Sequence, residues 1–150
     1  MQPLALPEKY TLRLLQSQDY DRNFFALLSQ LTVAPKVDKQ FFEEIVVDKN
    51  IRIYVIEDTS TAKLVATVRL NFERKLIRGG GTVCHFEDFV VDQDYRGEGL
   101  GSFLVQFAHA KAEERGCYKI LGICVESMMP FYEKQGFKKT GFVFGKYFET

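Results

Sequence analysis

Residues 96–101, Arg-Gly-Glu-Gly-Leu-Gly, have the types and the spacing to bind a phosphorylated ligand. An apolar segment runs up to this turn over residues 86–91, interrupted by the adjacent carboxylates Glu87 and Asp88, and a helical apolar pattern follows it. In a strand, a glycine-rich turn and a helix, backbone amides and the helix dipole favour a bound anion. Glycine also admits positive φ and lets a phosphate approach the backbone. The sequence therefore predicts a phosphorylated cofactor here, with two carboxylates nearby.

The spacing of the glycines argues against two common nucleotide-binding motifs. Gly97, Gly99 and Gly101 are two residues apart, whereas a dinucleotide fingerprint needs Gly-x-Gly-x-x-Gly. A P-loop would need Lys-Ser or Lys-Thr after its last glycine, and neither follows here. The pattern Arg-x-x-Gly-x-Gly resembles the pyrophosphate-binding loop of the GNAT superfamily of acetyl-CoA-dependent N-acetyltransferases. On this motif alone, a glycine-rich turn that holds no ligand is the alternative.

Length and composition narrow the class of protein. The chain has 150 residues, 46% of them hydrophobic, which fits one domain over residues 1–150. Its formal net charge is zero, which argues against bulk binding to nucleic acid or to an anionic membrane, and no apolar run is long enough to cross a bilayer. Three cysteines without a Cys-x-x-Cys pair and two histidines predict free thiols in a reducing compartment such as the cytoplasm, and no metal site.

The apolar patterning predicts strands and helices that alternate along the chain. Strands are expected over residues 10–15, 51–57, 64–72, 83–92, 118–125 and 142–148. Helices are expected after caps at Asp19 and Asp38, over residues 99–115, and from Ser127 to residue 135. This order predicts an α/β protein with a mixed central sheet and helices on both faces, which matches the GNAT fold.

A second motif comes near the C-terminus, where residues 131–137 read Phe-Tyr-Glu-Lys-Gln-Gly-Phe. It resembles the GNAT segment Phe-Tyr-x-x-x-Gly-Phe, whose tyrosine commonly lies near the thioester sulfur. The resemblance implies that Tyr132 donates a proton to the departing thiolate. An aromatic residue that only packs on a short helix is the alternative.

Further segments over residues 73–137 resemble the glucosamine 6-phosphate N-acetyltransferases. They are Glu-Arg-Lys at 73–75, His-x-Glu-Asp at 85–88 and Gly-Cys-Tyr-Lys at 116–119. The resemblance implies a homodimer that transfers the acetyl group of acetyl-CoA to the 2-amino group of glucosamine 6-phosphate, a step of UDP-N-acetylglucosamine biosynthesis. It also implies direct transfer in a ternary complex.

The resemblance assigns roles to particular residues. Those assigned to the cofactor are Phe89, Val90, Val91, Arg96, Gly97, Glu98, Gly99, Leu100, Gly101 and Ser102. Those assigned to the sugar phosphate are Thr32, Lys75, Arg78, Glu87, Asp88, Tyr118 and Lys119. Those assigned to catalysis are Tyr132, Glu87 and Asp88. Cations suit a phosphate dianion. The alternative for Lys75 and Arg78 is that they are solvent-exposed charges at the end of a strand.

The two carboxylates pose a geometric question. Consecutive strand residues point to opposite faces, so Glu87 and Asp88 reach one ligand only if the strand is bulged, as it is in this superfamily. Either carboxylate, or a water held by backbone carbonyls, could take the proton of the acceptor amine. The general base is therefore left open.

The chain departs from the family pattern at three places. Ile123 replaces an acidic residue, Met128 replaces an asparagine that contacts the cofactor, and Lys146 and Tyr147 stand near the position of a C-terminal arginine. Two other functions stay open at this point. One is acetyl transfer to another small amine, and the other is acyl-CoA binding as a sensor without turnover.

Overall fold

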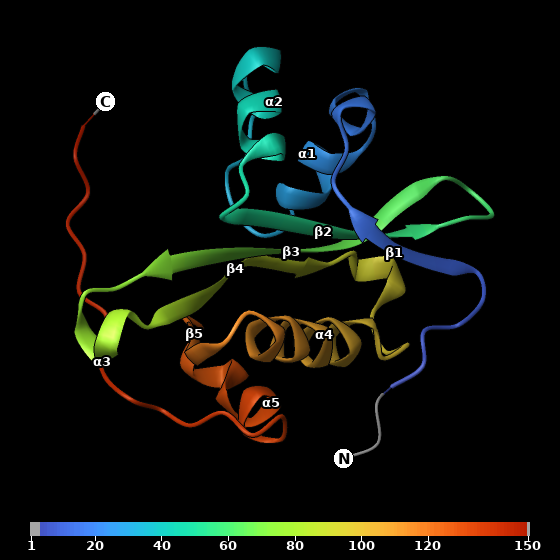
Figure 1. The fold of residues 1–150 in the computed structure, drawn as a ribbon. Coiled ribbons are helices and arrows are strands. Elements are labelled where there is room, and N and C mark those ends of the chain that lie inside the picture. The colour runs from blue at the N-terminus through green and yellow to red at the C-terminus, as the bar shows by residue number, and fades with distance from the viewer. Residues whose placement is uncertain (1–3, 150) are drawn as a thin grey trace.

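A five-stranded mixed sheet forms the centre of the computed structural model, which describes residues 4–149 (Figure 1). Its strands lie in the order of the chain: β1 (Tyr10–Leu14), β2 (Ile51–Asp58), β3 (Lys63–Arg74), β4 (Thr82–Val91) and β5 (Cys117–Gly122). The pairings from β1 to β4 are antiparallel, whereas β4 and β5 are parallel because a helix crosses over between them. The expected mixed sheet is confirmed.

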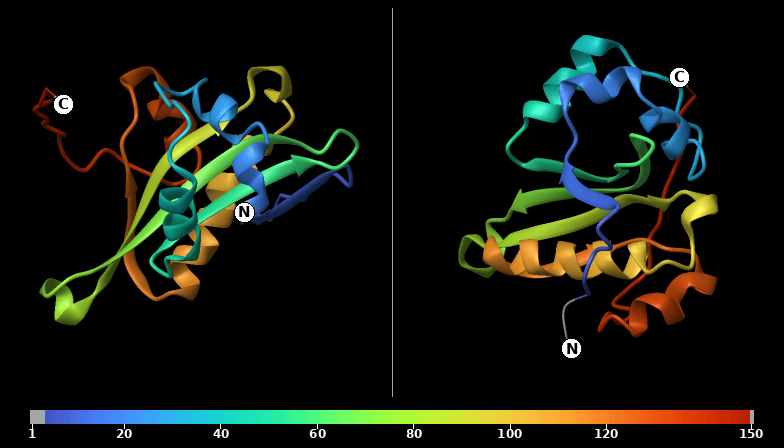
Figure 2. Two further views of the ribbon diagram at one scale, coloured as in Figure 1. Left: turned by 90° about the horizontal axis from the view of Figure 1, so that it is seen from above. Right: turned by 90° about the vertical axis from the view of Figure 1, so that its right-hand side faces the viewer.

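Helices cover both faces of the sheet, as expected (Figure 2). α1 (Phe24–Leu28) and α2 (Lys39–Val47) lie on one face, and α4 (Leu100–Glu114) and α5 (Met129–Glu133) lie on the other. The short α3 (Ile77–Gly80) closes the connection between β3 and β4. Single 3-10 turns occupy Ser17–Asp21, Gln93–Tyr95 and Glu126–Met128. No helix within residues 4–149 is long and apolar enough to cross a membrane.

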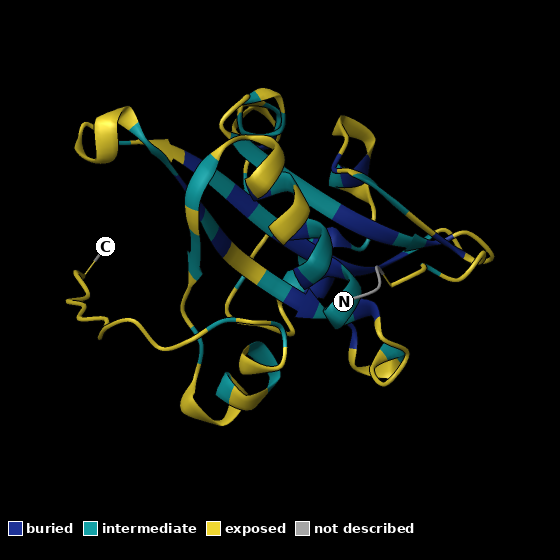
Figure 3. Cartoon of the chain, turned by 60° about the horizontal axis from the view of Figure 1, so that its bottom comes forward, coloured by how far each residue is buried: buried dark blue, intermediate teal, exposed yellow. Residues whose placement is uncertain are grey.

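Two apolar clusters hold these layers together, one on each face of the sheet. Most of the buried residues lie on the strands of the sheet (Figure 3). Between the sheet and α4, Leu70 and Phe86 pack with Leu104 and Ala108. On the opposite face, the members of the cluster are Leu15, Phe24, Leu27, Phe42, Val55, Leu64 and Val90. Because β3 and β4 contribute to both clusters, their two faces are both fixed, and the register of β4 is strongly specified.

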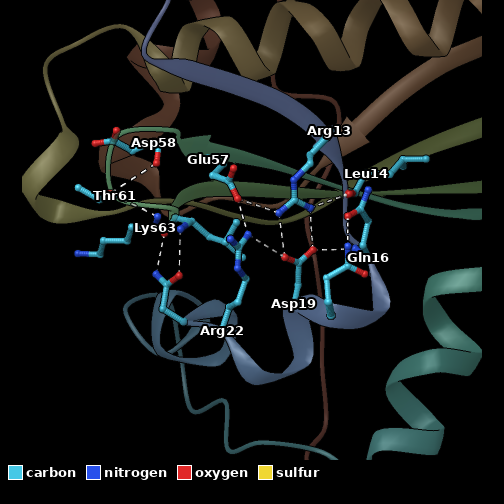
Figure 4. Close-up of polar contacts among 12 residues, drawn as sticks. Arg13, Leu14, Gln16, Asp19, Arg22, Glu57, Asp58, Thr61 and Lys63 are labelled. Carbon is cyan, nitrogen blue, oxygen red and sulfur yellow. Dashed lines mark hydrogen bonds and ion pairs between the residues drawn. The ribbon is translucent and has the colours of Figure 1, made fainter.

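The expected N-cap at Asp19 is wrong, whereas the one at Asp38 is confirmed. Asp19 lies inside a 3-10 turn, and its buried carboxylate accepts hydrogen bonds from the Arg13 guanidinium at 2.7 and 2.8 Å and from the Gln16 amide at 2.7 Å (Figure 4). With its oxygens committed to Arg13, Asp19 ties β1 to the following turn instead of capping a helix. Asp38 does cap α2, accepting from the amides of Gln40 and Phe41.

The expected strand over residues 142–148 is also wrong. From residue 137 to residue 149 the chain has no helix or strand, and it extends away from the sheet (Figures 1 and 2). Phe142, Phe144 and Phe148 are 89%, 97% and 78% exposed. Alternating aromatic residues fit a strand, but a strand also needs a partner edge, and this segment pairs with none of the described strands.

Two boundaries near the C-terminus also differ from the expectation. The strand expected over residues 118–125 is β5, which ends at Gly122, and its residues are partly or fully exposed. The helix expected from Ser127 to residue 135 is shorter, because Ser127 lies within a 3-10 turn and α5 covers only Met129–Glu133. Pro130 stands in the first turn of α5, where its missing amide costs nothing.

Candidate active site

A bulge in β4 presents the two carboxylates. Thr67 and Arg69 of β3, two residues apart, pair with Val90 and Glu87 of β4, which are three residues apart. β4 therefore holds one residue more than its partner strand, and Asp88 takes a left-handed conformation with φ of 49°. The bulge breaks the strand's alternation, so both Glu87 and Asp88 are exposed. The expected bulge is present at the expected place.

A second distortion lies beside the bulge, where β4 and β5 part. Phe86 and Gly122 are their last paired residues. The two backbones approach so closely there that a Cβ on Gly122 would lie 2.9 Å from the Phe86 carbonyl oxygen. Beyond this point β5 ends and the chain turns into α5, which leaves the backbone edge of residues 87–91 without a β5 partner.

The gap between the parted strands opens into a cleft of about 860 Å³. One wall is the bulged end of β4, residues 87–91, and the opposite wall comes from residues 123–125, Met128, Phe131 and Tyr132. The glycine-rich turn closes one end through Arg96, Gly97 and residues 99–102. Of the residues assigned to the cofactor from the sequence, all but Glu98 line this cleft.

The turn has the geometry of an anion site. Gly97 and Gly99 both have φ of 83°, a region that favours glycine, and Gly99 directly precedes the first residue of α4. The first amides of this 15-residue helix therefore start at the cleft, together with the positive end of the helix dipole. Gly101 has a different reason to be glycine, because a Cβ there would come within 3.3 Å of the Phe89 ring. The Arg96 Nε donates to the Val91 carbonyl oxygen at 3.2 Å, which fixes the start of the turn.

Tyr132 lies on the wall opposite the carboxylates. Its ring packs edge-on against Phe86, Phe131 and Phe137, with centroid distances of 6.1, 5.0 and 6.0 Å. Burial, assisted by the neighbouring Cys124, raises the pKa of Tyr132 to about 12. The phenol therefore keeps its proton at neutral pH and can act as a hydrogen-bond or proton donor.

The cations assigned to the sugar phosphate do not line the cleft. Lys75 is paired with Glu73 at 2.9 Å, and Arg78 stacks on the ring of Tyr118, with 5.2 Å to the centroid. Lys119 borders a separate hollow of about 330 Å³ that runs along β5 and shares Tyr132 with the cleft. Among the residues that the structure describes, Arg96 is the one cation that lines the cleft.

Thr32 also lies off the cleft, while its neighbours Gln30 and Leu31 line it. Gln30 reaches the strand-to-turn connection, where its side-chain oxygen accepts from the Gln93 amide at 2.9 Å. The sequence reasoning missed Gln30, Leu31, Cys124, Val125 and Gly122. Only Gly122 carried a usable signal, since a glycine inside a strand pattern indicates a close backbone approach.

No group of three or more metal-ligating side chains occurs within residues 4–149. Cys84, Cys117 and Cys124 are all free thiols. Burial raises the pKa of the Cys84 thiol to about 12, so this side chain is a poor nucleophile.

A mixed sheet whose parallel strands part beside a bulge, with a glycine-rich turn at the head of the crossover helix, defines a class of acyl-CoA-binding proteins. The chain belongs to the acetyltransferase (GNAT) family, whose family model matches residues 15–137. The expected GNAT fold is thereby confirmed.

Several similar proteins within this family share one name. The chain is 37% identical to the glucosamine 6-phosphate N-acetyltransferase of Arabidopsis thaliana, over 96% of this chain and 100% of that protein. It is 36% identical to the enzyme of the same name from Candida albicans, over 92% of this chain and 95% of that protein. The crystal structure of the Arabidopsis thaliana enzyme matches with a TM-score of 0.88 at 35% identity, covering 95% of this chain and 100% of that chain. An acetyltransferase from Trypanosoma brucei matches with a TM-score of 0.86 at 32% identity, covering 93% and 99%.

Proposed function

We propose that this protein transfers the acetyl group of acetyl-CoA to the 2-amino group of D-glucosamine 6-phosphate, giving N-acetylglucosamine 6-phosphate and CoA. This step belongs to UDP-N-acetylglucosamine biosynthesis. The observation that carries the proposal is the meeting of the carboxylate pair, the glycine-rich turn and Tyr132 in one cleft. Similarity to enzymes of that name over nearly the whole chain supports the choice of acceptor.

Acetyl-CoA fits the cleft in two respects. The amides of residues 97–101 and the dipole of α4 suit its pyrophosphate. The β4 edge beyond Phe86, which β5 leaves unpaired, offers backbone groups to the pantetheine arm in the way a strand pairs with its neighbour. The same backbone amides, near residues 89–91, can polarise the thioester carbonyl and stabilise the developing oxyanion.

Transfer then proceeds directly between the two substrates. The acceptor nitrogen forms a bond to the acetyl carbon while the carbon–sulfur bond breaks. The amine proton passes to Glu87 or Asp88, directly or through water, and Tyr132 gives its proton to the departing thiolate. The carboxyl group then releases its proton to solvent, and the phenol regains one from solvent.

A homodimer is part of the proposal. The phosphate of the acceptor carries two negative charges, yet Arg96 is the one described cation on the cleft, at the end assigned to CoA. The exposed side chains of Phe142, Phe144 and Tyr147 lie on a segment that β5, an edge strand, leaves unpaired. A second copy would cover these apolar side chains. It would also allow Lys75, Arg78 and Lys119 of one copy to contact the substrate phosphate bound in the cleft of the other.

We place this enzyme, as a single domain over residues 1–150, in the cytoplasm or another reducing compartment. The three free thiols support this placement, because oxidising compartments favour disulfides.

Acetyl-CoA consumption tests the proposal. The assay compares glucosamine 6-phosphate with glucosamine, glucose 6-phosphate and spermidine at equal concentrations. Of the four acceptors, only glucosamine 6-phosphate is expected to give fast turnover, because it alone carries both the amine and the phosphate. Turnover with spermidine only would assign the cleft to another amine, and CoA binding without turnover on any acceptor would assign it to a sensor.

A further inference from the structure

Glu98 poses an electrostatic problem inside the glycine-rich turn. Its backbone lies between Gly97 and Gly99, in the segment whose amides suit a pyrophosphate. A carboxylate pointing into that site would repel the phosphates at short range. Because glycine flanks it on both sides, the local backbone does little by itself to fix the direction of the side chain.

Two residues from the start of the chain settle where the Glu98 carboxylate lies. The Tyr10 hydroxyl donates to its Oε2 at 2.9 Å, from 88 positions away in the sequence. The Lys9 Nζ lies 3.4 Å from its Oε1. Gly97 and Gly99 line the cleft, whereas Glu98 does not. The carboxylate is therefore turned away from the site and paired with a cation and a phenol.

Tyr10 is itself firmly held. It is 4% exposed, and its ring packs edge-on against Tyr95 with 6.2 Å between the centroids. The Tyr95 hydroxyl donates in turn to the Asp58 carboxylate at 3.1 Å. Through Tyr10, β1 therefore contacts the segment around the turn at two residues. These are Tyr95, which precedes Arg96, and Glu98, which follows it.

We infer that Lys9 and Tyr10 are positioning residues that keep the Glu98 carboxylate off the cofactor's pyrophosphate and hold the turn ready for it. This inference rests on the proposed function, since it takes acetyl-CoA to bind at this turn. Lys9 and Tyr10 do not line the cleft. Their effect is therefore on cofactor affinity and not on the chemical step.

The test is the dissociation constant of CoA, measured by calorimetry on the full chain, combined with steady-state kinetics. Tyr10→Phe keeps the packed ring and removes the donor. We expect the dissociation constant of CoA and the KM for acetyl-CoA to rise roughly twofold to fivefold, the scale of one partly exposed charge contact, with kcat unchanged. Lys9→Gln is expected to act in the same direction, and added salt is expected to shrink both effects.

A double-mutant cycle separates this role from a structural one. In a Glu98→Gln background no charge needs to be held away, so adding Tyr10→Phe should leave the dissociation constant unchanged. Tyr20→Phe is the matched control, because its hydroxyl donates to the Val37 carbonyl oxygen at 2.6 Å, away from the turn. That variant should bind CoA as the wild type does.

The outcomes are distinguishable. If the wild type binds no CoA, the proposed function fails. If it binds CoA and Tyr10→Phe leaves the dissociation constant unchanged, or weakens binding equally in both backgrounds, the positioning role is wrong while the proposed function stands.

Discussion

Gly122 of β5 approaches Phe86 of β4 so closely that a Cβ on the glycine would lie 2.9 Å from the phenylalanine's carbonyl oxygen. This contact marks the last paired position before the two strands part. It therefore sets where the cleft begins, and the obstacle to a larger residue is backbone, which cannot rotate away.

Gly122→Ala is expected to push β5 from β4 at this point. We expect a loss of about 1–3 kcal/mol in the free energy of unfolding, the usual scale for forcing an extra methyl group into a packed site, and a higher KM for acetyl-CoA. Urea denaturation and steady-state kinetics measure the two effects. Gly141→Ala is the control, because nothing lies within 4 Å of a Cβ there. Equal stability of both variants would show that the close approach does not constrain the strands.

Tyr132→Phe tests the proton donor on the wall of the cleft. Removing the phenol proton is expected to lower kcat by about 10²-fold or more, since that is the typical scale for one acid–base group. CoA affinity should be retained, because the ring still packs against Phe86, Phe131 and Phe137. An unchanged kcat would remove Tyr132 from the mechanism.

The pH dependence of kcat in the wild type tests the protonation state of Tyr132. Because burial raises the pKa of Tyr132 to about 12, its proton is present throughout the neutral range. No loss of kcat from its deprotonation is expected up to about pH 9. A basic limb below that pH that disappeared in Tyr132→Phe would contradict the raised pKa.

Replacing each carboxylate in turn by the amide of the same shape distinguishes the roles of Glu87 and Asp88. Asp88→Asn suits the left-handed backbone at this position, because asparagine tolerates φ near the observed 49°. If Asp88 is the base, kcat/KM should fall by about 10²-fold or more. Glu87→Gln makes the same test of the neighbouring carboxylate. Retention of kcat/KM in both variants would assign the proton to water held by the backbone.

The Arg13–Asp19 pair makes a prediction about stability. Burial alone would raise the pKa of Asp19, but hydrogen bonds from Arg13 and the Gln16 amide, with the charges of Arg13 and Arg22, outweigh it and hold the pKa below its ordinary value. A lowered carboxyl pKa stabilises the fold above the unfolded-state value, and the contribution is lost as pH falls through the folded-state value. Asp19→Asn is expected to cost about 3 kcal/mol at neutral pH, the scale of breaking a buried ion pair.

Urea unfolding at neutral pH and at about pH 3 measures this linkage, and the gap between Asp19→Asn and the wild type should narrow at the lower pH. Asp21→Asn provides the control, because its pair with Lys36 at 3.1 Å is largely exposed and should contribute little. A gap that stayed constant with pH would mean that the charge of Asp19 is not the source of its effect.

The strand, turn and helix that form one side of the cleft could be predicted from the sequence because they are contiguous in the chain. Strand, glycine-rich turn and helix follow one another over residues 86–114, so periodicity and glycine positions were enough. The bulge was expected from the resemblance to the superfamily, whose members have one at this strand, and strand geometry explains why Glu87 and Asp88 need it to reach one ligand. The direction of the Glu98 side chain was not, because Lys9 and Tyr10 determine it from another strand.

The positions of Lys75 and Arg78 relative to the cleft could not be predicted from neighbouring residues in the sequence. Lys75 and Arg78 are near the carboxylates in the sequence, yet the register of the sheet carries them to its far end, where Lys75 follows β3 and Arg78 lies in α3. The segment over residues 142–148 shows the same limit, because its alternation predicts a strand while the partner edge depends on the rest of the structure. Asp19 was misassigned for a related reason, since its partner Arg13 lies on β1.

A crystal structure with CoA bound tests the central claim most directly. Its pyrophosphate is expected on the amides of residues 97–101, with the pantetheine arm between β4 and β5 and the sulfur near Tyr132. Density for CoA that lay elsewhere and left the glycine-rich turn without a ligand would contradict the account.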